Sequence, residues 1–316
     1  MTLLLTESNI LELLEIKEVI KEVERAFVEQ SLGKVNNFPR TRTYTESSVF
    51  NVMHASLSYI KRAGLKCYIS TKKGIKFVIL LFDTDTSELL AVMAAEAIGK
   101  YRTGAASAVA TKYLYGKRGF SFALIGSGGQ AITQLLAMHQ EFKPEKVKAW
   151  SPTKKNLLSF VERAAREGFE VTPASSIEEA CLDADVITTI TSSKEPFLSK
   201  EHIRDAAHIN ACGSNYPNRA EVMPECFPMF STICVDSLEQ SKIESGDFIL
   251  ASKKGMLKWE QVKELSQIIA SAKEREGKTL FKSNGIAMED VAVADLVYRK
   301  ALKEKTYSEI ELFKER

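Results

Sequence analysis

Residues 122–131 read Phe122-Ala-Leu-Ile-Gly-Ser-Gly-Gly-Gln-Ala131, and an amphipathic run from Ile132 to His139 follows at once. The apolar residues predict a strand, the glycines a tight turn, and the amphipathic run the start of a helix. This order fits the dinucleotide fingerprint Gly-x-Gly-x-x-Gly/Ala, in which the backbone comes close to a pyrophosphate at a helix N-terminus. The alternative is an ordinary glycine-rich turn. We expect the cofactor to contact six residues of the turn: Gly126, Ser127, Gly128, Gly129, Gln130 and Ala131.

After Gly119 strand-sized apolar runs alternate with helix-sized amphipathic runs, at the spacing typical of a parallel sheet. The expected strands cover residues 122–125, 146–150, 170–173, 186–189, 208–211 and 232–236. The expected helices cover residues 130–141, 154–167 and 176–180, and helices dominate from Lys258 onward.

The chain before residue 116 does not alternate in this way. It combines two helices near its start with strands expected over 49–56, 66–70, 77–83 and 89–93. An Ala-rich segment over 103–114, which Arg102 begins, is then expected to be a helix. The last helix, 288–304, has an apolar side with which it can return to this block. We therefore expect two domains, residues 1–116 with 287–316 and residues 117–286.

Composition excludes several classes of protein. The chain has 316 residues, 45% of them hydrophobic, and its net charge is only +2, which gives no reason to propose nucleic acid or a membrane as a partner. The apolar run after Met1 is too short for a signal peptide. The five scattered cysteines lack any Cys-x-x-Cys pair and predict reduced thiols in the cytoplasm. The four histidines form no metal-ligand spacing, so we expect no metal site.

The turn after the second strand of the fingerprint domain bears on the choice of nicotinamide cofactor. An acidic residue there favours NAD, because it bonds the ribose 2′-hydroxyl. This chain has Ser151, Thr153 and Lys154 instead. Hydroxyl and ammonium donors suit a 2′-phosphate, so we expect NADP(H) to be preferred, with NAD(H) possible. The alternative is that the lysine merely begins a solvated helix face.

Three basic residues stand in apolar or small surroundings. Lys66 begins an expected strand, Arg102 begins the Ala-rich helix, and Arg40 follows Pro39. A guanidinium binds a carboxylate through two hydrogen bonds, and a desolvated lysine can hold an anion or exchange a proton. Taken alone, each of these residues is more often a surface charge.

Several segments together resemble the ornithine cyclodeaminase/mu-crystallin family. They are residues 102–114 (Arg-Thr-Gly-Ala-Ala-Ser-Ala-Val-Ala-Thr-Lys-Tyr-Leu), 125–131, 208–217, 235–237, 244–247 and 281–290 (Phe-Lys-Ser-Asn-Gly-Ile-Ala-Met-Glu-Asp). The resemblance covers nearly the whole chain. It implies an α/β fold with a Rossmann dinucleotide-binding domain and a mixed α+β domain for substrate binding and dimerisation, and hence a homodimer.

The resemblance also implies roles for individual residues. Arg102 would hold the substrate carboxylate and Lys66 would stand beside the reacting carbon. Arg40 would be a second basic substrate residue, with Arg42 as the fallback. The remaining cofactor contacts would come from Thr189, Thr191 and Ser283, with Ser151, Thr153 and Lys154 at the 2′ position.

Asn215 departs from the family pattern. The ornithine cyclodeaminases and some alanine dehydrogenases carry an aspartate in the Gly-x-Asp-x-Pro turn, whereas this chain reads Gly213-Ser-Asn-Tyr-Pro217. Asn215 can hydrogen-bond an amine or water but cannot take a proton, and we count it with Lys66 and Arg102 as a catalytic candidate.

These features predict an NAD(P)H-dependent reductase or dehydrogenase for a small imino or amino acid, of the ketimine reductase, pyrroline-2-carboxylate reductase or alanine dehydrogenase type. Two alternatives stay open: an ornithine cyclodeaminase that gives proline and ammonia, and a non-enzymatic ligand-binding protein of the mu-crystallin type. Two retained basic residues, Lys66 and Arg102, argue against a pure binder.

Overall fold

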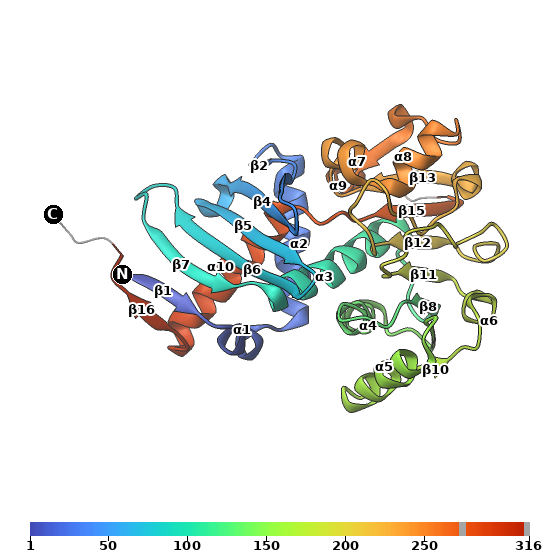
Figure 1. Ribbon diagram of the computed structural model, residues 1–316, viewed down its shortest axis with the longest axis horizontal. Helices are drawn as coiled ribbons and strands as arrows, with labels where there is room; N and C mark the ends of the chain where they lie inside the picture. Colours follow the sequence, from blue (N-terminus) through green and yellow to red (C-terminus); the bar gives the residue numbers. More distant parts are fainter. Residues whose placement is uncertain (272–275, 313–316) are drawn as a thin grey trace. The chain divides into compact units, whose positions relative to one another are not determined.

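The computed structural model describes residues 1–271 and 276–312 and divides into two compact units (Figure 1). The first unit comprises residues 1–102 and 286–312 of the described chain, and the second comprises 103–271 and 276–285. The sequence predicts the boundary at 116/117, after the Ala-rich helix. The compact units instead divide within that helix, α3 (Glu96–Leu114).

The first unit contains a mixed sheet. Its strands are β1 (Thr2–Leu5), β2 (Val35–Asn37), β3 (Thr41–Tyr44), β4 (Ser48–Leu57), β5 (Arg62–Thr71), β6 (Gly74–Asp83), β7 (Leu89–Ala94) and β16 (Ser308–Ile310). Their order is β16-β1-β7-β6-β5-β4-β2, and β3 pairs with β4. β1 runs parallel to β7, and the other pairs are antiparallel.

Helix α10 (Ala287–Glu304) lies along one face of this sheet, and α2 (Ile16–Ser31) packs against α10. The approach is close at Gly64 on β5, where a Cβ would lie 2.9 Å from the Leu80 carbonyl oxygen and 3.0 Å from Val291 Cγ2. Lys66, two residues along β5, points to the same face. The contact therefore places the first turn of α10 beside Lys66. A short helix, α1 (Glu7–Leu13), is capped by the Thr6 side chain.

The second unit contains a parallel sheet, the arrangement that the strand–helix alternation predicts. Its strands are β8 (Ser121–Ile125), β9 (Lys146–Trp150), β10 (Thr172–Pro173), β11 (Val186–Thr189), β12 (His208–Ala211), β13 (Phe230–Val235), β14 (Val262–Glu264) and β15 (Lys278–Lys282). Their order is β10-β9-β8-β11-β12-β15-β13-β14, and every pair is parallel. The order reverses between β8 and β11, and ligands of such sheets bind at the carboxyl ends of the strands near this point.

The helices of the second unit connect these strands. They are α4 (Ala131–Phe142), α5 (Lys154–Arg166), α6 (Ile177–Cys181), α7 (Leu238–Glu244), α8 (Gly246–Lys253) and α9 (Leu265–Ser271). The expected fold class, a Rossmann domain with a second mixed domain, is confirmed.

Three expected elements or regions differ from the structure in content or extent. The expectation that helices dominate after Lys258 misses β14 and β15, and β15 lies inside the sheet. Arg102 lies in the helix that it was expected to begin, but that helix starts six residues earlier, at Glu96, and continues through Gly99. The strand expected over 170–173 is reduced to the two residues of β10.

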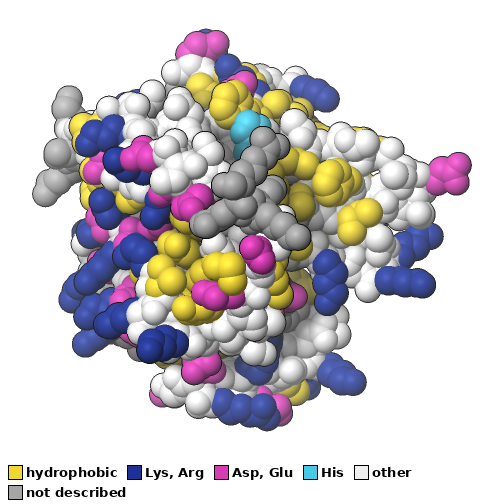
Figure 2. All heavy atoms as spheres, turned by 90° about the vertical axis from the view of Figure 1, so that its left-hand side faces the viewer, with side chains coloured by type: hydrophobic (Ala, Val, Ile, Leu, Met, Phe, Trp, Pro, Cys, Tyr) yellow, Lys and Arg dark blue, Asp and Glu magenta, His cyan; other side chains and the backbone are white. Residues whose placement is uncertain are grey.

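None of the helices in the described part of the chain is both long and apolar enough to cross a membrane. On the face shown in Figure 2, lysine and arginine side chains are interspersed with acidic and apolar ones. The mixture accords with the small net charge of the whole chain.

Candidate functional site

The glycine turn between β8 and α4 has the geometry that a pyrophosphate requires. Gly126 has a φ of +120°, and a Cβ there would lie 2.5 Å from the Ile190 carbonyl oxygen, so both the backbone and the space demand glycine. A Cβ at Gly128 would meet no atom of the described residues within 4 Å, which leaves open space above the turn. Ala131 is wholly buried at the start of α4. The turn therefore fits a bound phosphate at a helix N-terminus.

Two further observations concern this turn. Gln130, the N-cap residue of α4, makes no side-chain cap hydrogen bond, so a phosphate can act as the cap. The Arg163 guanidinium on α5 donates from Nη2 to the Ser127 carbonyl oxygen at 3.1 Å and holds the loop. Gly129 and Gln130 are exposed.

The residues expected at the 2′ position follow β9. Ser151 is half-buried, Thr153 and Lys154 are exposed, and Thr153 makes no side-chain cap bond to α5. These donors are accessible at the carboxyl end of the second strand. They suit a 2′-phosphate, while their role stays a prediction.

The buried carboxylate of Glu221 accepts hydrogen bonds both from the end of β11 with the residues that follow it and from the segment that follows β12. Its Oε1 accepts from the Thr191 amide and hydroxyl, each at 2.7 Å, and its Oε2 accepts from the Thr189 hydroxyl and the Gly213 amide, each at 2.8 Å. Burial raises the pKa of Glu221, and the nearby Lys282 charge opposes that shift. The Thr189 and Thr191 hydroxyls, expected to lie under the cofactor, thus point to Glu221.

Lys282 at the end of β15 is wholly buried and forms an ion pair with Asp247 at 3.0 Å. It also donates to the Ser214 carbonyl oxygen at 2.7 Å, while Asp247 Oδ1 accepts from the Glu221 and Val222 amides. The ion pair and these bonds fix the loop that carries Asn215. Asn215 itself is half-buried in that loop.

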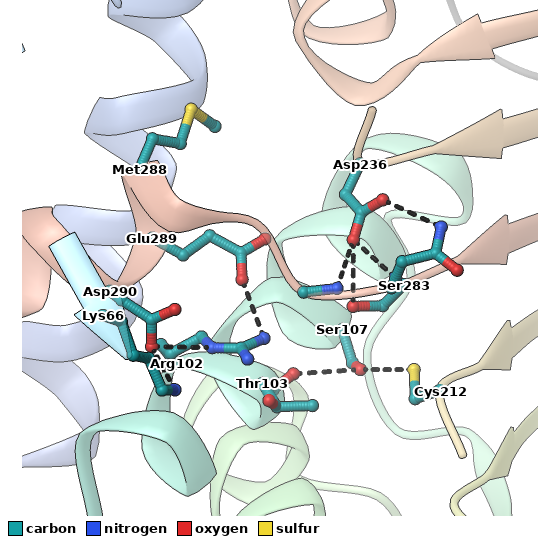
Figure 3. Close-up of polar contacts among 12 residues, drawn as sticks. Lys66, Arg102, Thr103, Ser107, Cys212, Asp236, Ser283, Met288, Glu289 and Asp290 are labelled. Carbon is teal, nitrogen blue, oxygen red and sulfur yellow. Dashed lines mark hydrogen bonds and ion pairs between the residues drawn. The ribbon is translucent and has the colours of Figure 1, made fainter. Parts of the chain in front are cut away.

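Asp236, after β13, organises the segment that carries Ser283. Its carboxylate accepts from the amides of Asn284 at 2.6 Å and Gly285 at 2.7 Å, and from the Ser283 hydroxyl at 3.4 Å (Figure 3). Burial raises the pKa of Asp236, and these backbone hydrogen bonds lower it in part. Ser283 is therefore buried in a rigid turn.

In the first unit, two of the basic residues expected to bind substrate, Lys66 and Arg102, lie beside the first turn of α10 (Figure 3). The Lys66 ammonium donates to Asp290 Oδ1 at 2.8 Å. The Arg102 guanidinium donates from Nε to the same oxygen at 3.3 Å and from Nη1 to Glu289 Oε2 at 3.0 Å. Glu289 and Asp290 are wholly buried, Lys66 is 3% exposed and Arg102 is 8% exposed. None of these cations is an ordinary surface charge.

The pKa values of the cluster reflect burial and mutual contact. Burial lowers the pKa of Lys66, and Arg102 and Arg40 lower it further, while Asp290 acts in the opposite direction. Burial tends to raise the pKa of Asp290, but Lys66 and Arg102 outweigh it, and the pKa lies below its usual value. Asp290 is therefore an anion at neutral pH, held between the Lys66 amine and the Arg102 guanidinium. Arg40 is buried as well, whereas Arg42 is only half-buried on β3.

Sequence reasoning missed the acidic residues that hold the site together. Their signal was present in part, since Asp236, Asp247, Glu289 and Asp290 all lie in the segments that carry the family resemblance. Lys282, which directly follows the apolar pair Leu280-Phe281 in β15, was the second signal. Among the described residues, no group of three or more His, Cys, Asp or Glu side chains could hold a metal ion.

Comparison with known proteins gives a consistent result. The model of the Ornithine cyclodeaminase/mu-crystallin family matches residues 1–305. The alanine dehydrogenase of Archaeoglobus fulgidus is 36% identical, and the match covers 99% of each chain. The structure of Δ1-pyrroline-2-carboxylate reductase of Thermococcus litoralis, in complex with NADH and L-proline, has a TM-score of 0.92 at 34% identity and covers 98% of this chain and 100% of that chain. An archaeal alanine dehydrogenase dimer with bound NAD has a TM-score of 0.92 at 33% identity, and the match covers 99% of each chain.

Proposed function

Because the chain belongs to the ornithine cyclodeaminase/mu-crystallin family, we propose that it is an NAD(P)H-dependent reductase or dehydrogenase for a small imino or amino acid. The observation that carries the proposal is the buried pair of cations, Lys66 and Arg102, fixed by Asp290 and Glu289. Such a pair suits a substrate with a carboxylate next to the carbon that bears nitrogen. The nicotinamide, when bound, supplies or accepts the hydride at that carbon.

The residues of the chain bind, orient and protonate the substrate. The Arg102 guanidinium, held in place by two carboxylates, binds the substrate carboxylate, and Arg40 adds a second positive charge. The Lys66 ammonium holds a proton for the substrate nitrogen or polarises the C=N bond. The glycine turn from Gly126 to Ala131 binds the pyrophosphate of the dinucleotide.

Asn215 separates this proposal from an ornithine cyclodeaminase. An amide at this position offers hydrogen bonds but no negative charge for the distal ammonium of ornithine. We therefore favour the reductase over the lyase. A non-enzymatic binder would have no need of buried Lys66 and Arg102, whose desolvation is costly.

We propose NADP(H) as the preferred cofactor, with NAD(H) also used. Ser151, Thr153 and Lys154 support this preference, because no carboxylate stands among residues 151–155 to repel a 2′-phosphate. Two structural relatives were solved with NADH and NAD, so NAD(H) use by this chain is compatible with its family. The cytoplasmic location stays a prediction from cysteine spacing.

A substrate panel tests the function. The purified protein is assayed with cyclic imino acids, with pyruvate plus ammonia, and with ornithine, each with NADH and NADPH. We expect reduction of a cyclic imino acid or of the pyruvate–ammonia mixture, and a lower KM for NADPH than for NADH. Ammonia release from ornithine without net nucleotide reduction would favour the lyase. Tight nucleotide binding without turnover of any substrate would favour the binder.

We also propose that the protein is a homodimer through one face of the first unit's sheet. Strand alternation places a set of apolar side chains on the face opposite α10, and several are well exposed, including Phe50 at 42%, Ile69 at 44% and Val78 at 37%. A structural relative is an archaeal alanine dehydrogenase dimer. Other apolar members of this face include Val52, Leu65, Cys67, Leu80 and Val92.

Replacing Val78 by aspartate should convert the dimer to a monomer. The new charge lies in the middle of the apolar face, where burial against a second copy would leave it unpaired. Light scattering after size exclusion should give about twice 35.2 kDa for the wild type and about 35.2 kDa for the variant. Leu158→Asp, on the exposed side of α5, is the matched control and should stay dimeric. A wild-type monomer, or a dimeric Val78→Asp, would contradict the interface.

A further inference from the structure

The first turn of α10 links two cations that come from different elements. Lys66 lies on β5 and Arg102 on α3, yet both donate to one oxygen, Asp290 Oδ1, at 2.8 and 3.3 Å. Among the described residues, the second oxygen, Oδ2, is buried and has no hydrogen-bond partner. The Asp290 carboxylate therefore accepts its side-chain hydrogen bonds from these two residues, Lys66 and Arg102.

We propose that Asp290 is a positioning residue that sets the distance between the Lys66 ammonium and the Arg102 guanidinium and keeps Lys66 charged for proton transfer. The inference rests on the proposed function, because it assigns Lys66 and Arg102 to one substrate. Glu289 plays a narrower part, since it bonds the other end of the guanidinium through Nη1.

Charge in the cluster agrees with this role. The groups that act on Lys66 are Asp290 from α10, Arg102 from α3 and Arg40 from the segment before β3. The Phe77 ring on β6 also faces it, with the ammonium 5.0 Å from the ring centroid. With Lys66 protonated and Glu289 on Arg102, the cluster holds three cations and two anions, a net charge of +1. One substrate carboxylate neutralises it.

The position of Asp290 in the chain adds to the argument. Glu289 and Asp290 lie in the first turn of an 18-residue helix, where the free N–H groups and the helix dipole stabilise negative charge. Asp290 therefore stays ionised although it is wholly buried. It can supply a permanent negative charge to Lys66 without competing for the proton.

Asp290→Asn tests the role with little change of shape. Removal of the charge leaves Lys66 facing two arginines, so its ammonium form becomes less favourable. We expect the alkaline limb of the kcat profile to move down by about 1–3 pH units. We also expect kcat to fall by about 100-fold at the optimum, since the proton donor is displaced. A purely structural ion pair would lower stability without moving the alkaline limb.

Glu289→Gln is the matched control. It removes a buried negative charge from the next residue of the same turn but leaves the contact between Lys66 and Asp290 intact. We expect a higher KM for the carboxylate substrate and a displacement of the alkaline limb less than half as large. Equal displacement in the two variants would overturn the specific role of Asp290.

A second measurement does not depend on turnover. Nuclear magnetic resonance of protein labelled with carbon-13 at lysine Cε, with the Lys66 signal assigned through Lys66→Met, follows Lys66 directly. We expect Lys66 to lose its proton at lower pH in Asp290→Asn than in the wild type, and identical titrations would overturn the proposal. If the wild type reduces none of the assayed substrates, the proposed function fails while this measurement still decides the role of Asp290.

Asp290→Glu covers the case in which the asparagine variant does not fold. Glutamate restores the negative charge but places the carboxylate one methylene farther from the backbone. Lys66 should therefore titrate near the wild-type pH, while kcat falls because the ammonium is displaced. Wild-type kcat in Asp290→Glu, or a Lys66 titration displaced despite the restored charge, would overturn the proposal.

Discussion

Replacing Arg102 by alanine is expected to raise KM for the imino or amino acid by about 100-fold or more, with a smaller effect on kcat. Hydrogen bonds between charged groups contribute about 1.5–3 kcal/mol each, and a guanidinium offers two to a carboxylate. Arg102 is 8% exposed and fixed by Glu289 and Asp290, so it is oriented before substrate arrives. Steady-state kinetics over a wide range of substrate concentrations measure the split between KM and kcat.

The same substitution should also reduce stability. Glu289 would lose its guanidinium partner, and breaking a buried ion pair costs about 3–5 kcal/mol. Urea unfolding therefore accompanies the kinetics, so that loss of folded protein is not counted as loss of binding. Lys100→Ala is the control, since Lys100 is a half-buried residue of the same helix whose ammonium pairs with the exposed Glu96. It should change neither KM nor stability by much. Unchanged KM and kcat in folded Arg102→Ala would remove Arg102 from the site.

Local patterns predicted most of the fold. The fingerprint from Phe122 to Ala131, and strands such as 146–150, 186–189 and 208–211, are determined by residues close together in sequence, and the structure confirms them. The family resemblance is confirmed over residues 1–305. Lys66 and Arg102 prove to lie in one buried cluster, a result that neither local segment alone could give.

The missed features depend on contacts between distant residues. β15 carries Lys282, and a lysine in an inner strand contradicts the usual pattern of a buried parallel strand. The charge of Lys282 is tolerated because Asp247, from helix α8, forms an ion pair with it. Helix α3 begins at Glu96 and runs through Gly99, although glycine is a weak helix former. Local propensity carries no information about partners that are distant in sequence. It therefore could not identify Glu221, Asp236 or Asp290 as the acids whose hydrogen bonds and ion pairs position the site residues.

The largest stability effect in the second unit is expected for Glu221→Gln. The two oxygens of Glu221 accept four hydrogen bonds, and each oxygen accepts one backbone amide, from Thr191 or from Gly213. Glutamine has a single oxygen, so its NH₂ group must face a backbone N–H whichever way the amide is turned. Leaving a buried donor unpaired costs about 1–3 kcal/mol, and the variant also removes a negative charge near Lys282. We expect a loss of about 2–4 kcal/mol in urea unfolding.

Glu221→Gln should also weaken cofactor binding. The segments that bond to Glu221 follow β11 and β12, at the carboxyl edge of the Rossmann sheet, where dinucleotides bind in this fold. Titration of nucleotide by fluorescence measures the dissociation constant under conditions where the variant is folded. Glu225→Gln is the control, since Glu225 is an exposed acid that pairs only with half-exposed Lys254 among its described contacts. Its substitution should cost less than about 0.5 kcal/mol. The prediction is contradicted if Glu221→Gln matches Glu225→Gln in both its urea unfolding and its nucleotide dissociation constant. The four hydrogen bonds to Glu221 would then not be what positions the segments that carry Thr191 and Gly213, and the strands alone would position them.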